Sequence, residues 1–227
     1  MVESGFCIRT DDPASAGFFI AQKTRDKSVT CFRYIHVLRR KQAGLADTRG
    51  SFTQEPTVSP PSLVHPIAID SLMYYASRAP MGAIVEVGVY KGGTAWHLAK
   101  LGRPLYLYDS FEGMPTSTDK DVHQIGVFAD CSAEAVQKAI PSAHVIKGMF
   151  PDSLVEMPPV GFVHADADQY ESTKAILEIM PPLMVRGGMI LFDDYMVADC
   201  PGCTQALHES QYRILVIGET GKALVIV

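Results

Sequence analysis

The chain has 227 residues, of which 47% are apolar and 20% are charged, and it contains 18 Gly and 15 Pro. This composition is that of an ordinary globular protein and excludes collagen-like, fibrous and disordered classes. Lys and Arg number 20 against 25 Asp and Glu, so the net charge of −5 gives no electrostatic reason to expect nucleic acid or an anionic membrane as a partner.

Three further features indicate the cellular compartment of the protein. No stretch approaches the roughly 18 apolar residues of a spanning helix. The first residues lack the basic and apolar regions of a signal peptide. Five cysteines are a low, odd number that suits a reducing environment better than a disulfide framework. We therefore expect a cytoplasmic protein with no membrane and no nucleic-acid partner.

The composition changes near residue 60. Residues 1–60 end in a segment rich in Pro, Ser and Thr at 54–61, which is typical of a linker. Within them, the apolar positions of residues 30–43 follow neither the helical period nor the strand period cleanly. This segment is expected to be a helix or part of a hairpin. We expect an N-terminal extension, 1–60, followed by a domain, 61–227.

From residue 62 onward, apolar runs bounded by turn residues alternate with helical segments. Helices are expected at 62–78, 92–101, 132–140, 171–180 and about 202–210. Strands are expected at 83–88, 105–109, 143–147, 161–166, 189–193, 213–217 and 223–227. Strands that are apolar on both faces and separated by helices indicate an α/β fold with a mostly parallel, doubly wound sheet.

A glycine-rich turn joins the first expected strand to the next helix. It contains Gly88, Gly92 and Gly93. Glycines let the backbone approach a ligand, and free N–H groups at a helix start favour a carboxylate or phosphate, so a nucleotide-type ligand fits. The spacing is not that of a dinucleotide fold, and Glu86 stands two positions before the first glycine. A tight turn without a ligand is the alternative.

An acidic residue ends the next expected strand. Asp109 stands 21 positions after Gly88, about where nucleotide-binding folds place the carboxylate that accepts hydrogen bonds from ribose hydroxyls. Ser110 and Phe111 follow directly and would border the nucleoside. The alternative is an ordinary strand-end cap or a solvated loop residue.

Two more expected strands end in acids. Asp166 and Asp168 follow one, and Asp193 and Asp194 follow the other. Parallel neighbours finish on the same edge of a sheet, so Asp166, Asp193 and Asp194 would converge there. Their mutual repulsion is tolerable when a hard cation, Mg²⁺ or Ca²⁺, neutralises them. In the alternative, Asp168 caps the following helix and Asp194 is solvated.

Five ordered motifs resemble those of the macrocin O-methyltransferase family. They lie at 85–93, 109–115, 147–150, 164–173 and 187–195, and the resemblance covers about 62–210. It implies a Rossmann-like class I methyltransferase fold with an antiparallel C-terminal strand. It also implies Mg²⁺-dependent transfer of a methyl group from S-adenosylmethionine to sugar hydroxyls of natural products.

The resemblance also implies roles for particular residues. Those expected to form the cofactor site are Glu86, Gly88 and Gly92 around the methionine end, Asp109 at the ribose, Ser110 and Phe111 at the adenosine, together with Thr94 and Asp166. Those expected to hold the metal are Asp166, Asp193 and Asp194. Asp166 or Asp168 would accept the proton of the acceptor hydroxyl. His123, in the polar loop 116–127, is a second candidate base, although a lone loop histidine is more often simply solvated.

The extension 1–60 carries no motif of this family. In the family, this region helps to build the acceptor pocket and the oligomer, so the extension is expected to act as a lid, part of the acceptor pocket or an oligomer contact. The expected partners are a small hydroxylated acceptor and further copies of the chain in a homo-oligomer.

Three other interpretations compete with this one. Tyr170 and Lys174 match the Y-x-x-x-K pair of NAD(P)-dependent short-chain dehydrogenases, against which the glycine spacing argues. Cys200 and Cys203 have the spacing of a redox pair or half a zinc site, but no second such pair exists, so two reduced thiols are favoured. A non-catalytic S-adenosylmethionine-binding module remains the alternative to an enzyme.

Overall fold

The computed structural model describes residues 59–115, 118–218 and 221–227. The expected extension, 1–60, lies almost entirely outside these residues, as does the choice between helix and hairpin at 30–43. None of the described helices is long and apolar enough to cross a bilayer.

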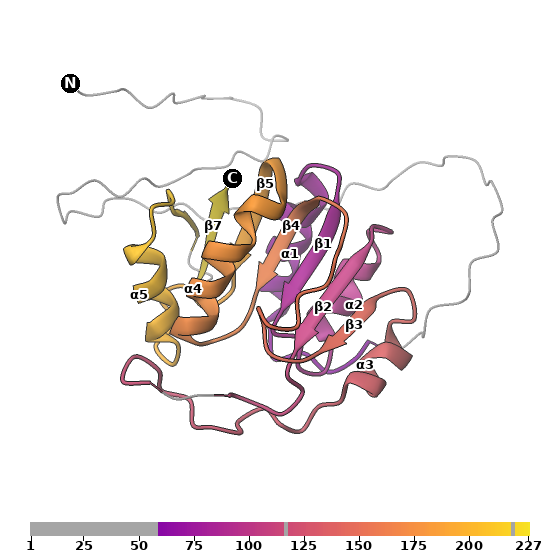
Figure 1. The fold of residues 1–227 in the computed structure, drawn as a ribbon, viewed down its shortest axis with the longest axis horizontal. Coiled ribbons are helices and arrows are strands. Elements are labelled where there is room, and N and C mark those ends of the chain that lie inside the picture. The colour runs from indigo at the N-terminus through magenta and orange to yellow at the C-terminus, as the bar shows by residue number, and fades with distance from the viewer. Residues whose placement is uncertain (1–58, 116–117, 219–220) are drawn as a thin grey trace. The chain divides into compact units, whose positions relative to one another are not determined.

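Helices and strands alternate along the described chain (Figure 1). Its helices are α1 (Pro66–Arg78), α2 (Gly93–Ala99), α3 (Ala133–Ala139), α4 (Tyr170–Ile179), α5 (Pro201–Glu209) and a 3₁₀ turn, η1 (Pro181–Leu183). Its strands are β1 (Ala83–Val87), β2 (Leu105–Asp109), β3 (His144–Lys147), β4 (Val160–Ala165), β5 (Met184–Phe192), β6 (Leu215–Ile217) and β7 (Lys222–Ile226).

The strands form one sheet in the order β3-β2-β1-β4-β5-β7-β6. The pairs from β3 to β5 are parallel, and β7 runs antiparallel to both β5 and β6. The direction of winding changes between β1 and β4, which is the switch point where open α/β sheets bind ligands. The expected doubly wound α/β fold with an antiparallel C-terminal strand is confirmed.

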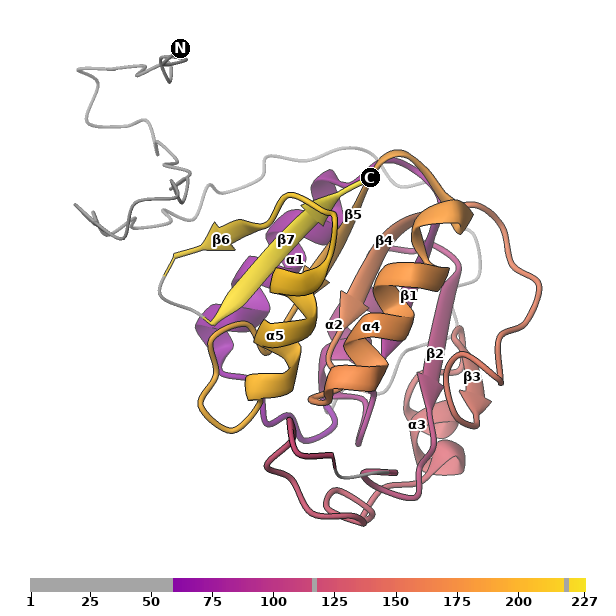
Figure 2. The ribbon, with the colours of Figure 1, turned by 60° about the vertical axis from the view of Figure 1, so that its left-hand side comes forward.

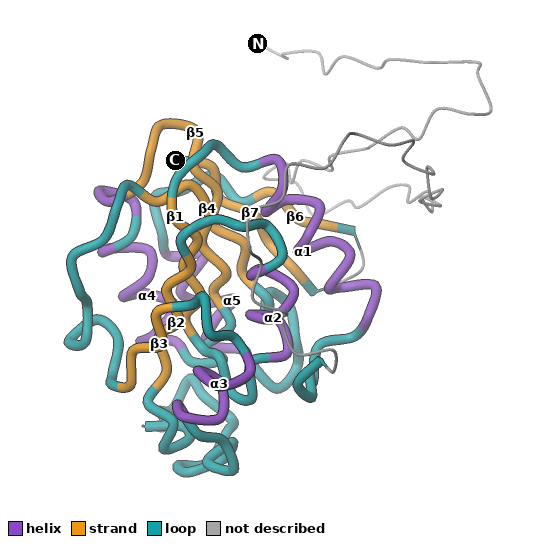
Figure 3. The backbone as a smooth tube through the Cα atoms, turned by 90° about the vertical axis from the view of Figure 1, so that its right-hand side faces the viewer, coloured by secondary structure: helices purple, strands orange, loops and turns teal. Residues whose placement is uncertain are grey.

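Helices cover both faces of the sheet. Along β1, successive side chains point to opposite faces, so Ile84 packs in the core under α1, α2 and α3, while Val85 packs in the core under α4 and α5. Figure 2 shows α4 and α5 lying over one face, and Figure 3 shows α1, α2 and α3 on the other. This double burial explains why the strands are apolar at almost every position.

Two boundaries differ from the expected ones by more than two residues. Helix α1 begins at Pro66 instead of residue 62, because proline suits the first helical position and His65 caps it, accepting from the Ile67 N–H at 3.3 Å. Strand β5 begins at Met184, five positions before the expected start, because Met184 pairs with Val160. The Gly-Gly sequence at 187–188, which reads as a turn, is an irregularity within this strand.

A guanidinium group ties the end of α1 to the start of β2. Arg103 donates to the carbonyls of Gly82 at 2.8 Å, Pro80 at 2.7 Å and Ala76 at 3.2 Å. One partly buried side chain thereby satisfies a carbonyl of α1 and two carbonyls of the segment between α1 and β1. Gly161 packs against the same group, since a Cβ there would lie 2.3 Å from Arg103 Nη2.

We expect Arg103→Met to lower the free energy of unfolding by about 2–3 kcal/mol, because hydrogen bonds from a charged group are lost and carbonyls are left unsatisfied. Denaturant unfolding measures this change. Arg186→Met removes an exposed arginine from β5 and is the matched control. Equal unfolding midpoints for the two variants would show that the Arg103 contacts contribute nothing.

Candidate functional site

A cavity of about 520 Å³ opens at the carboxyl ends of β1, β2, β4 and β5. Its volume lies within the range of small-molecule sites. The segment that links β2 to α3 runs past these strand ends (Figure 1). Most of the residues expected to be functional line this cavity: Gly88, Thr94, Asp109, Ser110, His123, Asp166, Asp168, Asp193 and Asp194.

Three of the expected cofactor residues do not line the cavity. Glu86 is fully buried beneath it, and Phe111 is 6% exposed and belongs to the core. Gly92 caps α2 in the left-handed conformation, with φ at 84°.

Gly88 is required by packing as well as by any ligand. Its φ is 88°, and a Cβ on it would lie 1.7 Å from the Asp166 carbonyl oxygen. The Asp166 N–H donates to the Val87 carbonyl at 2.9 Å, so the ends of β1 and β4 are held together here. Glycine is the only residue that fits this approach, which is why the glycine turn alone is weak evidence for a cofactor.

Asp109 holds the glycine turn in place. Its Oδ2 accepts from the N–H groups of Val89 and Tyr90, both at 2.8 Å, and its Oδ1 accepts from the Phe111 N–H at 2.7 Å. An ionised carboxylate has about four acceptor positions. About one therefore remains for a ribose hydroxyl, so Asp109 combines the strand-end role with capacity for the predicted ribose contact.

Three carboxylates meet on one side of the cavity. Asp166, Asp168 and Asp194 each place an oxygen within 4.8 Å of the others. Asp168 adopts a left-handed conformation with φ at 58°, and its N–H donates to Asp194 Oδ2 at 3.3 Å. We call these residues the carboxylate cluster.

Burial makes the charge of this cluster unfavourable. Desolvation, followed by the neighbouring Asp168, raises the pKa of Asp194 to about 7. Desolvation also raises the pKa of Asp166 well above its ordinary value, with Asp194 as the next cause, and raises the pKa of Asp168. Protons or a cation must therefore compensate these groups near neutral pH.

Asp193 has other neighbours than the expected metal set implies. Its Oδ1 forms an ion pair with Lys222 Nζ and lies 3.2 Å from His164 Nε2. The structure groups Asp193 with His164 and Asp166, whereas Asp194 is grouped with Asp166 and Asp168. The expected trio of Asp166, Asp193 and Asp194 is thus divided between two clusters, because Lys222 and His164 hold Asp193 Oδ1.

A buried polar row continues from Asp193 across four adjacent strands. His164 Nδ1 lies 2.7 Å from Glu86 Oε1, and both side chains are fully buried. Burial lowers the pKa of Lys222 to about 8, although the Asp166 charge opposes this shift. The sequence predicts no role for His164 or Lys222. Their only signal was an ionisable residue in an otherwise apolar strand.

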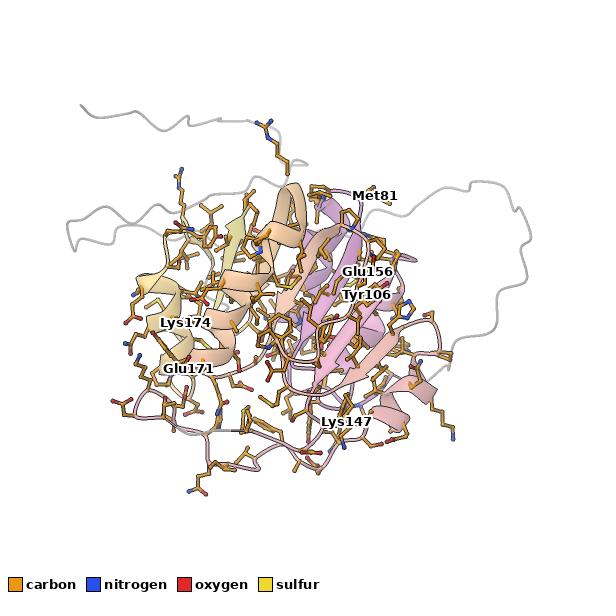
Figure 4. All side chains as sticks on the ribbon, in the orientation of Figure 1. Met81, Tyr106, Lys147, Glu156, Glu171 and Lys174 are labelled. Atoms are coloured by element: carbon orange, nitrogen blue, oxygen red, sulfur yellow. The ribbon has the colours of Figure 1, made fainter. Side chains whose placement is uncertain are left out.

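The dehydrogenase pair is not assembled. The Tyr170 hydroxyl donates to Glu209 Oε2 at 2.6 Å, and neither Tyr170 nor Lys174 lines the cavity. Lys174 is exposed on α4 (Figure 4). The described cysteines, Cys131, Cys200 and Cys203, are free thiols.

Several curated proteins resemble the chain. It is 27% identical to the 8-demethyl-8-(2,3-dimethoxy-alpha-L-rhamnosyl)-tetracenomycin-C 4'-O-methyltransferase of Streptomyces olivaceus, over 67% of this chain and 70% of the relative. It is 27% identical to the mycinamicin III 3''-O-methyltransferase of Micromonospora griseorubida, over 58% of this chain, and 26% identical to the demethyldecarbamoylnovobiocin O-methyltransferase of Streptomyces niveus, over 61%. The matches span 61% of each of these last two relatives.

Solved structures share the fold. The O-methyltransferase NovP superposes with a TM-score of 0.59 at 22% identity, covering 70% of this chain and 78% of that one. The calicheamicin methyltransferase CalS11 superposes with a TM-score of 0.55 at 20% identity, covering 70% and 77%.

The macrocin O-methyltransferase (TylF) family model matches residues 75–215. These residues include β1, the glycine turn, Asp109 and all four strand-end carboxylates of the cavity. The chain therefore belongs to the macrocin O-methyltransferase family and is an S-adenosylmethionine-dependent O-methyltransferase.

Proposed function

We propose that the chain transfers the methyl group of S-adenosylmethionine to a hydroxyl of a sugar or other small natural-product acceptor, with Mg²⁺ or another divalent cation at the carboxylate cluster. The observation that carries this proposal is the convergence of Asp166, Asp168 and Asp194 in a cavity that the glycine turn also lines. The matched relatives support the acceptor class, because the name of one of them specifies a rhamnosyl group on a natural product.

The cofactor would occupy the part of the cavity beside the glycine turn. Gly88, Thr94 and Ser110 line that part, and Asp109 retains about one acceptor position for a ribose hydroxyl. Glu86 and Phe111 would support the turn from the core. Methyl transfer needs the acceptor oxygen in line with the sulfonium methyl group, so the chief contribution of these residues is positioning.

The carboxylate cluster fits a hard cation. It offers only oxygen ligands, and desolvation favours neutralisation of its charge. Asp166 and Asp194 are the proposed ligands, and Asp193 would join them only through an oxygen that Lys222 and His164 leave free. A bound Mg²⁺ would supply Lewis acidity that lowers the pKa of the acceptor hydroxyl.

Asp168 is the proposed general base. The acceptor oxygen forms a bond to the methyl carbon, the carbon–sulfur bond breaks, S-adenosylhomocysteine leaves, and the hydroxyl proton passes to the Asp168 carboxylate. Asp166 is the alternative base, and His123, which also lines the cavity, is a third candidate. A non-catalytic binding module would have no need of this costly group of acids.

Residues 1–60 are proposed to complete the acceptor pocket, close over it or join copies of the chain in a homo-oligomer. The proposed location is the cytoplasm, which suits the free thiols among the described cysteines.

The acceptor is tested by incubating the whole chain with S-adenosylmethionine, Mg²⁺ and a panel of glycosylated natural products, with mass spectrometry as the readout. The expected result is the gain of one methylene on a glycoside, and no gain on its analogue lacking the methylated hydroxyl. Methylation restricted to non-sugar hydroxyls would contradict the sugar proposal.

We expect Asp168→Asn to lower kcat by about 10²–10⁴, because the amide cannot accept the proton. Cofactor affinity, measured by calorimetric titration, should change less than about twofold, since the chemistry is impaired and the binding step is not. Asp152→Asn removes an exposed carboxylate and should leave both quantities unchanged. An Asp168→Asn enzyme with wild-type kcat would eliminate this residue as the base.

We expect Asp109→Asn to weaken S-adenosylmethionine binding about 10- to 100-fold, because the amide NH₂ replaces an oxygen that accepts backbone N–H groups of the turn. Calorimetric titration measures the affinity. Glu112→Gln alters a neighbouring carboxylate whose side chain is 73% exposed and serves as the control. Unaltered affinity in Asp109→Asn would refute both the turn-holding and the ribose roles.

A further inference from the structure

A second group of potential metal ligands adjoins the carboxylate cluster. His123, Asp168 and Cys200 each place a ligand atom within 4.8 Å of the others. Cys200 Sγ lies 3.3 Å from Asp168 Oδ1 and 3.7 Å from His123 Nε2. We propose that these three residues bind Zn²⁺ or a similar borderline-soft cation, and that this cation inhibits methyl transfer by engaging Asp168.

The loop that carries His123 is anchored against two helices. Asp121 Oδ1 accepts from the Tyr170 N–H at 2.9 Å, and Asp121 Oδ2 accepts from the Thr118 hydroxyl at 2.7 Å. Gly202 leaves room for this contact, since a Cβ there would lie 2.6 Å from Asp121 Oδ1. These contacts hold the loop two residues before His123, whose imidazole lies beside Cys200.

The other two ligands are also held in place. The N–H of Asp168 donates to Asp194, and the thiol of Cys200 donates to Asp168. The Cys200 N–H donates to the Val197 carbonyl at 3.1 Å, immediately before α5 begins. The three ligands therefore come from three separate segments that are each fixed by contacts of their own.

The types of ligand distinguish this group from the carboxylate cluster. One nitrogen, one sulfur and one oxygen suit Zn²⁺, which commonly takes three protein ligands and leaves one position open. Mg²⁺ prefers oxygen and has little affinity for a thiolate. When the zinc–sulfur bond forms, the S–H bond breaks and the proton passes to solvent. The two neighbouring groups are therefore expected to select different cations.

Asp168 belongs both to the carboxylate cluster and to the proposed zinc site, so zinc binding would impair methyl transfer. A carboxylate oxygen bound to Zn²⁺ is a poor acceptor for the hydroxyl proton. This inhibitory consequence rests on the proposed function, in which Asp168 is the base, whereas the binding site itself does not.

The neighbouring Cys203 provides a control. Its Sγ accepts from the Thr173 hydroxyl at 3.1 Å and lies 3.9 Å from the Gln169 carbonyl. It is as buried as Cys200 but lies outside the group of three ligands. Cys200 is therefore the proposed ligand, and Cys203 is an equally buried cysteine that is not a ligand.

The binding test is a titration of the full chain with Co²⁺, which replaces Zn²⁺ and shows an ultraviolet thiolate-to-cobalt charge-transfer band. We expect one equivalent of this band in the wild type, its loss in Cys200→Ser and its retention in Cys203→Ser. His123→Ala, in a surface loop, should weaken Co²⁺ binding at least tenfold. Thermal melting confirms that each variant is folded. A band that persists in Cys200→Ser, or that is absent from the wild type, would overturn the site.

The second test measures methyl transfer in saturating Mg²⁺ with increasing Zn²⁺. We expect at least tenfold inhibition of the wild type and of Cys203→Ser, and at least tenfold weaker sensitivity in Cys200→Ser, each relative to its own rate without zinc. Equal inhibition of all three would overturn the inhibitory role. If no acceptor is methylated, the proposed function fails on its own, and the cobalt titration still decides the binding site.

Discussion

Desolvation of carboxylates at one edge of the sheet is the constraint on which the rest of the site depends. Parallel strands β4 and β5 end side by side, so the acids that follow them cannot avoid one another. Burial and mutual repulsion raise the pKa of Asp194 to about 7 and raise that of Asp166 well above its ordinary value. Burying these acids in their ionised form costs free energy that apolar residues in the same positions would not cost. Their presence beside the glycine turn therefore connects the architecture to methyl transfer.

The molecule compensates its buried acids in two ways. Asp193 is neutralised from within, because Lys222 reaches it from the antiparallel strand β7 and His164 contacts it from β4. Lys222 also interacts with the charge of Asp166, but desolvation still raises the pKa of Asp166 well above its ordinary value, so a proton or an added cation is left to balance the carboxylate cluster. Strand β7, which lies between β5 and β6, therefore supplies the lysine that pairs with Asp193.

Much of the fold and the outline of the site could be predicted from sequence. Hydrophobic runs and turn residues located the strands, and the strand-end acids fell in one cavity as parallel geometry requires. The pairing of Asp193 with Lys222 could not be predicted, because it depends on how β7 is inserted into the sheet. The burial of Glu86 follows from its alternation with Val85 and Val87, which turns it toward His164 instead of the cavity. The full extent of β5 was hidden by its two glycines, which local reasoning reads as a turn.

The most direct test of the central claim is the effect of Mg²⁺ on the melting temperature at two pH values. The pKa of Asp194 is raised in the folded state, so without metal the folded protein binds more protons and loses stability as pH rises from about 4 to about 7. Mg²⁺ binds the ionised cluster and should reverse this loss. At a hundredfold excess over its dissociation constant it contributes about 2.7 kcal/mol, or about 5–10 °C. The account predicts this shift at about pH 8, little shift at about pH 5.5, and its loss in Asp194→Asn. An equal shift at both pH values, or in the variant, would contradict it.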